Sequence, residues 1–486
     1  MSVHEENAVI NLDPPDKEAR GEIAEQHSIY TSREKWFIVA LIAFGGLFSP
    51  LSSNIYFPVI PLLSNLINLT VTMYIVFQGI CATHVLGNTS RLLGAKPMFI
   101  GCLLLLSGSC IGLALIREYW LLLLLRCFQA AGSASTIALG AGVIGDISEP
   151  GERAGFFGLY NIGPLVGPAI GPVIGGALSD GLGWRSIFWF LCIASSTCAL
   201  VLILFLPETL RSMVGNGSIT PPAIYRPLLP IIRRKKARST NIRLPRKPFQ
   251  NPLRLLLNPD ILILLGFNGL ICAVFYGVVS SISTVFHAAY PALNETQIGL
   301  CFLAIGGGML LGSVTFGKIL DWDYQRVKKS ISEAKPDAMS HDSSFPIEKA
   351  RMRLMPILVA IYVGCCSGYG WCIEKKQTLL RTLYHPVGFL SIAIMNGTQT
   401  LILDLVPEQG SSVTACNNLV RCALSAAMVA CIQLILTALG SGWTYVLLAG
   451  LCVLASPLIY VVMHIGPSCR ARRRVISEQE GTLGAS

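Results

Sequence analysis

The sequence predicts an all-α integral membrane protein in which twelve transmembrane helices form two pseudo-symmetric six-helix bundles. Three observations lead to this fold class. Only 13% of the 486 residues are charged and 52% are hydrophobic, whereas about 25% of residues are charged in an ordinary soluble domain. Twelve mostly apolar stretches follow one another, each near the roughly 20 residues that a helix needs to cross a bilayer. Landmarks in the first six stretches recur in the second six.

The composition also narrows the function. Such a low charged fraction excludes a cytosolic enzyme, a nucleic-acid-binding protein and a disordered scaffold. The net charge of +10 is expected here, because membrane proteins collect Lys and Arg in their cytoplasmic loops. Most of the 16 cysteines lie in apolar runs without metal-binding spacing, so we interpret them as packing residues. No nucleotide-binding loop appears, and we expect no enzymatic activity, no metal, no cofactor and no nucleic-acid partner.

The predicted spans have edges defined to within about 2–4 residues. Span two is the weakest, since Gln78, Thr83 and His84 interrupt its apolar run. In the first half the spans cover about 35–57, 70–88, 97–116, 119–145, 154–178 and 186–206; in the second half they cover about 261–284, 297–319, 354–373, 384–405, 412–437 and 443–464.

The charges between the spans predict the orientation. Lys and Arg are enriched in the cytoplasmic loops of membrane proteins. Both tails and the basic central loop are therefore predicted to be cytoplasmic. Loops 58–69 and 438–442 contain neither Lys nor Arg and are predicted to face outward. Asn294 begins an Asn-Glu-Thr sequon in an outward loop and is a candidate for glycosylation. The regions are an acidic tail 1–34, an N-terminal six-helix bundle 35–206, a central loop 207–260, a C-terminal six-helix bundle 261–464 and a basic tail 465–486.

The two halves carry matching landmarks. Asp146 ends span four and precedes Asn161 by 15 residues, while Asp404 ends span ten and precedes Asn418 by 14 residues. A Gly-Trp pair also stands before span six and before span twelve. Duplicated halves of this kind place a site near the bilayer midplane and give alternating access by rocking against each other.

Span five contains a repeat of glycines and prolines. A glycine at every fourth position lines one helix face and permits close approach of a neighbouring helix, and interior prolines remove backbone donors and bend the helix. Ordinary small-residue packing would explain the glycines alone. The residues are Gly163, Pro164, Gly167, Pro168, Gly171, Pro172, Gly175 and Gly176.

Arg126 and Gln129 are the polar residues of span four. A charge inside a span is costly and usually faces a cavity or a partner, and Arg126 would lie about 10 Å deep at 1.5 Å per residue. The alternative is that its side chain extends to the outer interface. In span eleven, Asn417 and Arg421 share one helix face, with Asn418 beside them, and indicate a polar lining of the second half's cavity. Asn161 is the counterpart in the first half.

Further polar residues inside spans are candidates for the transport pathway. Each is equally well interpreted as an interhelical hydrogen-bond donor. They are Asn54, Gln78, His84, Asn268, Tyr276, Asn396 and Gln399.

Asp146 and Asp404 lie at predicted cytoplasmic helix ends, where an Asp can pair with a loop arginine such as Arg153 and act as a latch. A solvated helix-end charge is the alternative. Proton coupling normally uses an embedded carboxylate, and the sequence has none at mid-depth in any predicted span.

These motifs resemble the major facilitator superfamily, in particular fungal twelve-span drug:proton antiporters of the quinidine-resistance type. The resemblance covers about 35–470. It rests on Arg126 to Gly132, the glycine–proline repeat, 184–189, 206–211, 317–324 and 417–421.

The resemblance implies a proton-coupled exporter of small hydrophobic or amphipathic compounds, a monomer in the lipid bilayer of the plasma membrane or, alternatively, the vacuole. Small-molecule substrate and protons would be its partners. An importer of a small nutrient on the same fold is a rival, as is a non-transporting sensor or impaired carrier.

One departure supports the last rival. The family pattern after span two carries an Asp that latches the cytoplasmic side, but Arg91 stands there, between Gly87 and Gly94, and only Lys96 remains of the basic pair. Asp321 belongs to the corresponding stretch of the second half. The resemblance predicts a weakened latch, and we favour an atypical but functional carrier over a non-functional one. An error in the gene model around 80–93 would give the same pattern.

Overall fold

The computed structural model confirms the all-helical membrane fold class. It describes residues 28–59, 75, 94–116, 118–148, 152–215, 219, 221–222, 225–229, 252–334, 347–375, 380–406 and 410–483, and no strand occurs among them. Apart from residue 75, predicted span two lies outside the described residues, and so do Gln78, His84, Gly87 and Arg91.

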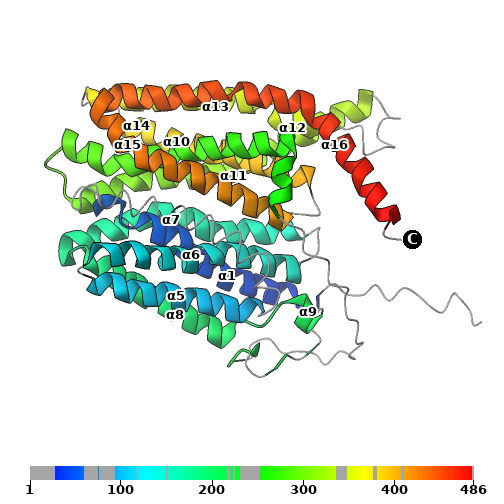
Figure 1. Ribbon diagram of the computed structural model, residues 1–486, viewed down its shortest axis with the longest axis horizontal. Helices are drawn as coiled ribbons and strands as arrows, with labels where there is room; N and C mark the ends of the chain where they lie inside the picture. The colour runs from blue at the N-terminus through cyan, green and yellow to red at the C-terminus, as the bar shows by residue number, and fades with distance from the viewer. Residues whose placement is uncertain are drawn as a thin grey trace, which may run out of the picture.

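The first half is a layered bundle of long helices, drawn blue to green in the lower part of Figure 1. Its first helix begins with a capping box in which Thr31 Oγ1 accepts a hydrogen bond from the Glu34 amide and Glu34 caps the Thr31 amide in return. The elements are α1 (Ser32–Asn54), η2 (Phe57–Val59), α5 (Ala95–Leu115), α6 (Tyr119–Ile147), α7 (Arg153–Leu182), α8 (Arg185–Phe205) and α9 (Arg211–Val214).

The second half repeats this arrangement and lies above the first half in Figure 1. Its last helix extends beyond the bundle toward the C-terminus. The elements are η5 (Pro252–Leu257), α10 (Pro259–Ala289), α11 (Glu295–Ala334), α12 (Ile347–Met352), α13 (Met355–Glu374), α14 (Leu380–Leu405), α15 (Gly410–Ala455) and α16 (Pro457–Leu483).

Two crossings are joined within α15. A straight helix of 46 residues would be about 69 Å long, far more than a bilayer needs. The backbone reverses at Gly440, whose φ of 75° is readily available only to glycine. Thr444 Oγ1 then donates back to the Ile435 carbonyl at 3.3 Å. The ten long apolar stretches of the described chain therefore make eleven crossings.

The two halves meet along α7 and α11. A Cβ atom added at Gly306 would overlap Ala169, and one added at Gly299 would overlap the Pro172 carbonyl, so the backbones are in close approach. We call the end of the bundle where α1 ends and α11 begins the distal end, and the opposite end, where α1 begins, the terminal end.

Contacts between the halves close the distal end. Ser283 Oγ donates to the Phe57 carbonyl at 2.6 Å, and Thr296 Oγ1 donates to Asp180 Oδ2 at 2.8 Å. The rings of Phe57 and Phe302 stack with centroids 6.2 Å apart. These distal contacts place η2 and the end of α7 against the end of α10 and the first turns of α11.

Candidate functional site

Arg126 is buried inside the first half. It comes about two turns after the start of α6, and only 3% of its surface is exposed, so it does not reach the distal surface. Its Nη1 donates to Gln129 Oε1 at 2.9 Å, because residues three apart share a helix face. Its guanidinium carbon lies 4.0 Å from the centroid of the Tyr56 ring and 5.0 Å from that of Phe188.

Among the described residues, the guanidinium of Arg126 contacts aromatic rings and Gln129 but no carboxylate. Its Nε is buried without a hydrogen-bond partner, and so is the hydroxyl of Tyr56. Gln129, which is fully buried, donates in turn to Cys110 Sγ at 3.4 Å. Cation–π contacts and the hydrogen bond to Gln129 together offset part of the cost of burying the charge.

The second half presents a chain of amides across three helices. Asn268 of α10 donates to Asn417 of α15 at 2.8 Å, and Asn417 donates to Gln399 of α14 at 3.4 Å. The carbonyl oxygen of Asn268 is buried without a partner. A buried polar network stabilises one packing arrangement when all of its groups are hydrogen-bonded. The unpaired side-chain oxygen of Asn268 is therefore a position where a further donor could bind.

Arg421 follows Asn417 by one turn and lies beside Cys272, Tyr276 and Cys422. Its side chain is only half-buried, and no hydrogen bond or ion pair holds it within the described part of the chain. The interior of the second half therefore also carries a cation without a carboxylate.

Tyr276 connects the two cations. It interacts electrostatically with Arg421 in its own half and with Tyr56 in the other half. Because Tyr56 lies against Arg126, these electrostatic interactions link the polar and aromatic residues of the two halves. We refer to Tyr56, Arg126, Tyr276 and Arg421 as the arginine centre.

The structure places the other predicted pathway residues elsewhere. Asn54 donates to the Pro50 carbonyl of its own helix at 2.6 Å, and Asn396 donates to Ser313 of α11 at 3.2 Å. Asn161 is exposed on α7, and Asn418 is half-buried. Tyr56 and Phe188 were not predicted, because nothing in the sequence connects these aromatic residues to Arg126.

The glycine face of span five packs on α1. Added Cβ atoms at Gly163 and Gly175 would overlap the carbonyl oxygens of Ala43 and Ile55, and one at Gly167 would lie 2.6 Å from Pro50. Gly171 has more room, at 3.4 Å from the nearest atom. Gly176 faces the Glu295 carbonyl of the second half, and Pro164, Pro168 and Pro172 all lie within the helix.

At the terminal end, Glu208 joins the end of α8 to the start of α5. Its fully buried carboxylate accepts hydrogen bonds from the amides of Ala95, Lys96, Thr209 and Leu210 at 2.9–3.2 Å. Gly94 has a φ of 93°, and a Cβ there would lie 2.6 Å from Glu208 Oε2. The Lys96 ammonium donates to the carbonyls of Ile203 and Arg226.

The predicted latch aspartates differ in their partners. In the second half, Arg351 Nε contacts Asp404 Oδ2 at 3.0 Å. In the first half, Arg211 Nε donates to the Asp146 carbonyl at 2.9 Å. The side chains of Arg153 and Asp321 lie outside the described atoms, so the expected Asp146–Arg153 pair stays a prediction.

Asn294 is exposed and caps α11, because its Oδ1 accepts from the Gln297 amide at 3.0 Å.

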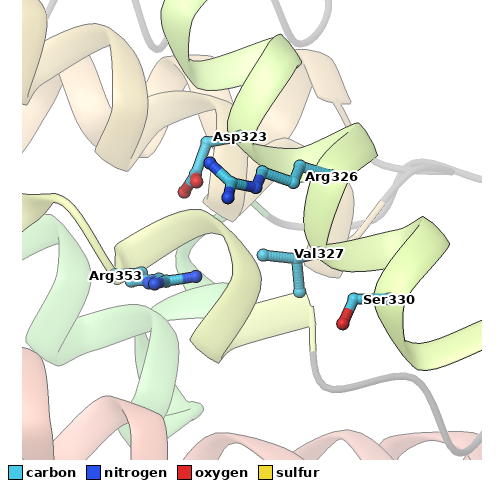
Figure 2. A pocket seen from close by; sticks show the side chains of 5 residues that line it. All are labelled: Asp323, Arg326, Val327, Ser330 and Arg353. Atoms are coloured by element: carbon cyan, nitrogen blue, oxygen red, sulfur yellow. The ribbon is translucent and has the colours of Figure 1, made fainter. Parts of the chain in front are cut away.

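A separate pocket of about 320 Å³ lies at the terminal end, lined by Asp323, Arg326, Val327, Ser330 and Arg353. Figure 2 shows Arg326 beside Asp323 on α11, with Arg353 across the pocket. No cluster of potential metal ligands occurs among the described residues.

Comparison with known proteins agrees with this architecture. Residues 42–430 match the family model of the Major Facilitator Superfamily. The chain belongs to this superfamily. Its similarity extends over nearly the whole sequence to fungal transporters of the superfamily.

Three curated relatives illustrate this similarity. Citrate exporter 1 of Aspergillus niger is 35% identical and covers 96% of this chain and 92% of its own. Multidrug transporter QDR2 of Candida glabrata is 34% identical over 91% of this chain and 82% of its own length. MFS antiporter QDR1 of Candida albicans is 32% identical over 90% of this chain and 89% of its own length. The quinidine-resistance resemblance is thereby confirmed.

Solved structures show the same superfamily fold. A bacterial homologue of the human lysosomal transporter Spinster, described as inward-facing and unoccupied, superposes with a TM-score of 0.58 at 13% identity, covering 90% of this chain and 98% of its own. The human organic anion transporter MFSD10 gives a TM-score of 0.54 at 16% identity, covering 88% and 100%.

Proposed function

We propose that this superfamily member is a proton-coupled exporter of small amphipathic organic compounds that works by alternating access. The observation that carries the proposal is the arginine centre, because both halves contribute polar and aromatic groups to one place. A midplane site between two repeats is where such folds bind their cargo. Aromatic rings provide apolar contact there, and the cations and amides provide orientation.

The distal contacts supply the moving part of this mechanism. With the predicted orientation, the Phe57–Ser283 and Asp180–Thr296 hydrogen bonds close the outer side, so cargo enters from the cytoplasm. Release to the outside requires these contacts to separate while the terminal end closes. The small residues along α7 and α11 allow the bundles to rock against each other, since few side chains interlock there.

Export is supported by the relatives and by the integrity of the terminal end. Relatives are named as a citrate exporter, a multidrug transporter and an antiporter, so small organic compounds as a class are the expected cargo. The buried Glu208 supports a working carrier despite Arg91, because it still connects α5 to the end of α8. Proton coupling rests on the resemblance to antiporters.

Yeast cells expressing the protein test this proposal. Cells are loaded with fluorescein or with tetramethylrhodamine methyl ester, two xanthene dyes of opposite charge, and retained dye is measured after lysis at fixed pH. We expect faster efflux of at least one dye than in vector controls, and loss of that efflux with a protonophore. Faster dye accumulation would indicate an importer, and unchanged retention of both dyes would contradict transport of amphipathic compounds.

A further inference from the structure

We infer that the cargo of the arginine centre is an organic anion, bound through its carboxylates by Arg126 and Arg421. This inference rests on the proposed transport function and names its substrate class.

The first observation is a charge imbalance inside the protein. Arg126 and Arg421 lie within the helices, and no described carboxylate forms an ion pair with either of them. The ion pairs of the described chain lie at its terminal end, for example Arg351 with Asp404 and Lys35 with Glu152. Residues 60–93, which include predicted span two, contain no Asp or Glu and bring no carboxylate to the centre.

A buried Arg126 and a half-buried Arg421 inside the bundles, both without a described anion, are unfavourable, because the interior solvates a charge less well than water does. Each has some compensation: Arg126 has two aromatic rings and Gln129, and Arg421 has Tyr276 and nearby thiols. The rings and the amide carry no charge, and the tyrosine hydroxyl and the thiols are neutral in their ordinary protonated form. A bound anion would supply the missing charge, whereas a cationic cargo would add a third positive charge.

The second observation concerns free donors. Arg126 Nε is buried without a hydrogen-bond acceptor, and Arg421 has no hydrogen bond within the described residues. Guanidinium groups match carboxylates in shape and bind them through paired hydrogen bonds. The rings of Tyr56, Phe188 and Tyr276 beside these donors favour a carboxylate attached to an apolar or aromatic body.

The centre is also arranged for an anion with two charges. One arginine comes from each half: Arg126 lies against the Tyr56 ring, and Tyr276 interacts electrostatically with both Tyr56 and Arg421. A dianion would contact both cations at once and bring the halves together, whereas a monoanion would satisfy only one of them. We therefore expect dianions to bind more tightly than monoanions of the same size.

Binding and transport by purified protein test the inference separately. Fluorescein and tetramethylrhodamine methyl ester are titrated by fluorescence anisotropy in detergent, and unlabelled phthalate and benzoate compete for the bound fluorescein. We expect a Kd for fluorescein at least about tenfold below that for the cationic ester, and competition by phthalate at about tenfold lower concentration than by benzoate.

Variants assign the effect to the arginines. Arg421→Gln and Arg126→Gln should each raise the fluorescein Kd about tenfold or more, as expected when a charged hydrogen bond is lost, without weakening the binding of the ester. Arg421→Lys should retain part of the affinity, because it keeps the charge. Lys329→Gln removes an equal charge from the exposed surface of α11 and should leave both Kd values unchanged.

The outcomes separate the two proposals. Preferential binding of the cationic ester, absence of binding by fluorescein, or fluorescein binding that is unaffected in both arginine variants would overturn the anion inference. If proteoliposomes held at zero membrane potential transport the cationic ester but not fluorescein, the exporter proposal remains and the anion inference is wrong. Arginine-dependent fluorescein binding without movement of either dye would support the anion site and contradict the exporter.

Discussion

At the scale of the residue, Tyr56 determines how Arg126 tolerates burial. Its ring lies 4.0 Å from the guanidinium carbon, but its hydroxyl is buried without a partner. The two parts of the side chain therefore make different contributions. The ring provides a cation–π contact that is worth about 2 kcal/mol when it is desolvated, and the hydroxyl provides no hydrogen bond that offsets its own burial.

Substitution of Tyr56 separates these contributions. Tyr56→Phe keeps the ring and should retain dye transport and thermal stability, whereas Tyr56→Ala should lower transport by about tenfold to thirtyfold, the equivalent of the lost cation–π contact. Initial efflux rates, corrected for the amount of protein in the membrane, provide the measurement. An equal loss in Tyr56→Phe would show that the hydroxyl contacts cargo.

Glu208 is a second residue whose contribution follows from its contacts. Four backbone amides donate to its carboxylate, including two from the first turn of α5. The first N–H groups of a helix have no partner inside the helix and favour a negative charge. We expect Glu208→Gln to destabilise the protein by about 1–3 kcal/mol.

A lower unfolding midpoint of the purified protein in detergent would reveal this loss. Glu333→Gln is the matched control, because Glu333 is exposed on α11 and its ion pair with Lys329 is a surface contact of little energetic value. Equal midpoints for the two variants would contradict the capping role of Glu208.

At the scale of the element, α7 and α1 depend on each other through glycine. The space beside the four-residue repeat is uneven, since Gly175 leaves no room against Ile55 while Gly171 has 3.4 Å. Gly158, on the same helix, has no neighbour within 4 Å of an added Cβ. One helix therefore contains both the tight position and its own control.

An alanine series along α7 tests this packing. Gly158→Ala and Gly171→Ala should be tolerated, with a gain of about 1 kcal/mol at Gly158 from helix propensity. Gly175→Ala forces a backbone overlap and should cost about 3 kcal/mol or abolish expression. The amount of folded protein after mild heating, measured by size-exclusion fluorescence, ranks the variants. Equal tolerance at positions 158 and 175 would contradict the observed helix approach.

At the scale of the whole molecule, the distal contacts fix the state of the carrier. Asp180 and Thr296 come from different halves and are joined at 2.8 Å. The paired substitutions Asp180→Cys and Thr296→Cys should allow a short bifunctional thiol reagent to lock this end. We expect dye transport to stop on cross-linking and to return when a cleavable reagent is reduced.

Each single cysteine variant is the control for this experiment, because the chain has cysteines of its own. The single variants should keep transporting after the same treatment. Continued transport by the cross-linked pair would mean that the distal end does not open during the cycle.

The sequence predicted the fold class because a bilayer demands long apolar helices, and it predicted Arg126 and Arg421 because a charge at such a position is costly. It did not predict the roles of Asn54 and Asn396, since a polar residue in a span is equally suited to local or interhelical hydrogen bonds. Their actual partners depend on helix rotation, which the apolar pattern leaves open.

Tyr56 and Glu208 illustrate a different gap. Aromatic residues are common in membrane helices, so the contact of Tyr56 with Arg126, which comes from another helix, has no signal in the sequence. Glu208 appears in the sequence as a charge after span six, and its partners Ala95 and Lys96 are more than a hundred residues away. Only the packing of α5 against α8 brings them together.

The unpaired charges of the arginine centre have an electrical consequence. A membrane potential acts on any net charge that shifts within it, at about 2.3 kcal/mol per elementary charge for 100 mV across the full thickness. With the predicted orientation, an empty carrier with two interior cations should therefore be drawn toward the negative, cytoplasmic side, from which the proposed exporter would collect its cargo. A carrier holding a dianion is neutral at its centre, so its outward step should be insensitive to voltage, and the return step should set the voltage dependence of the cycle.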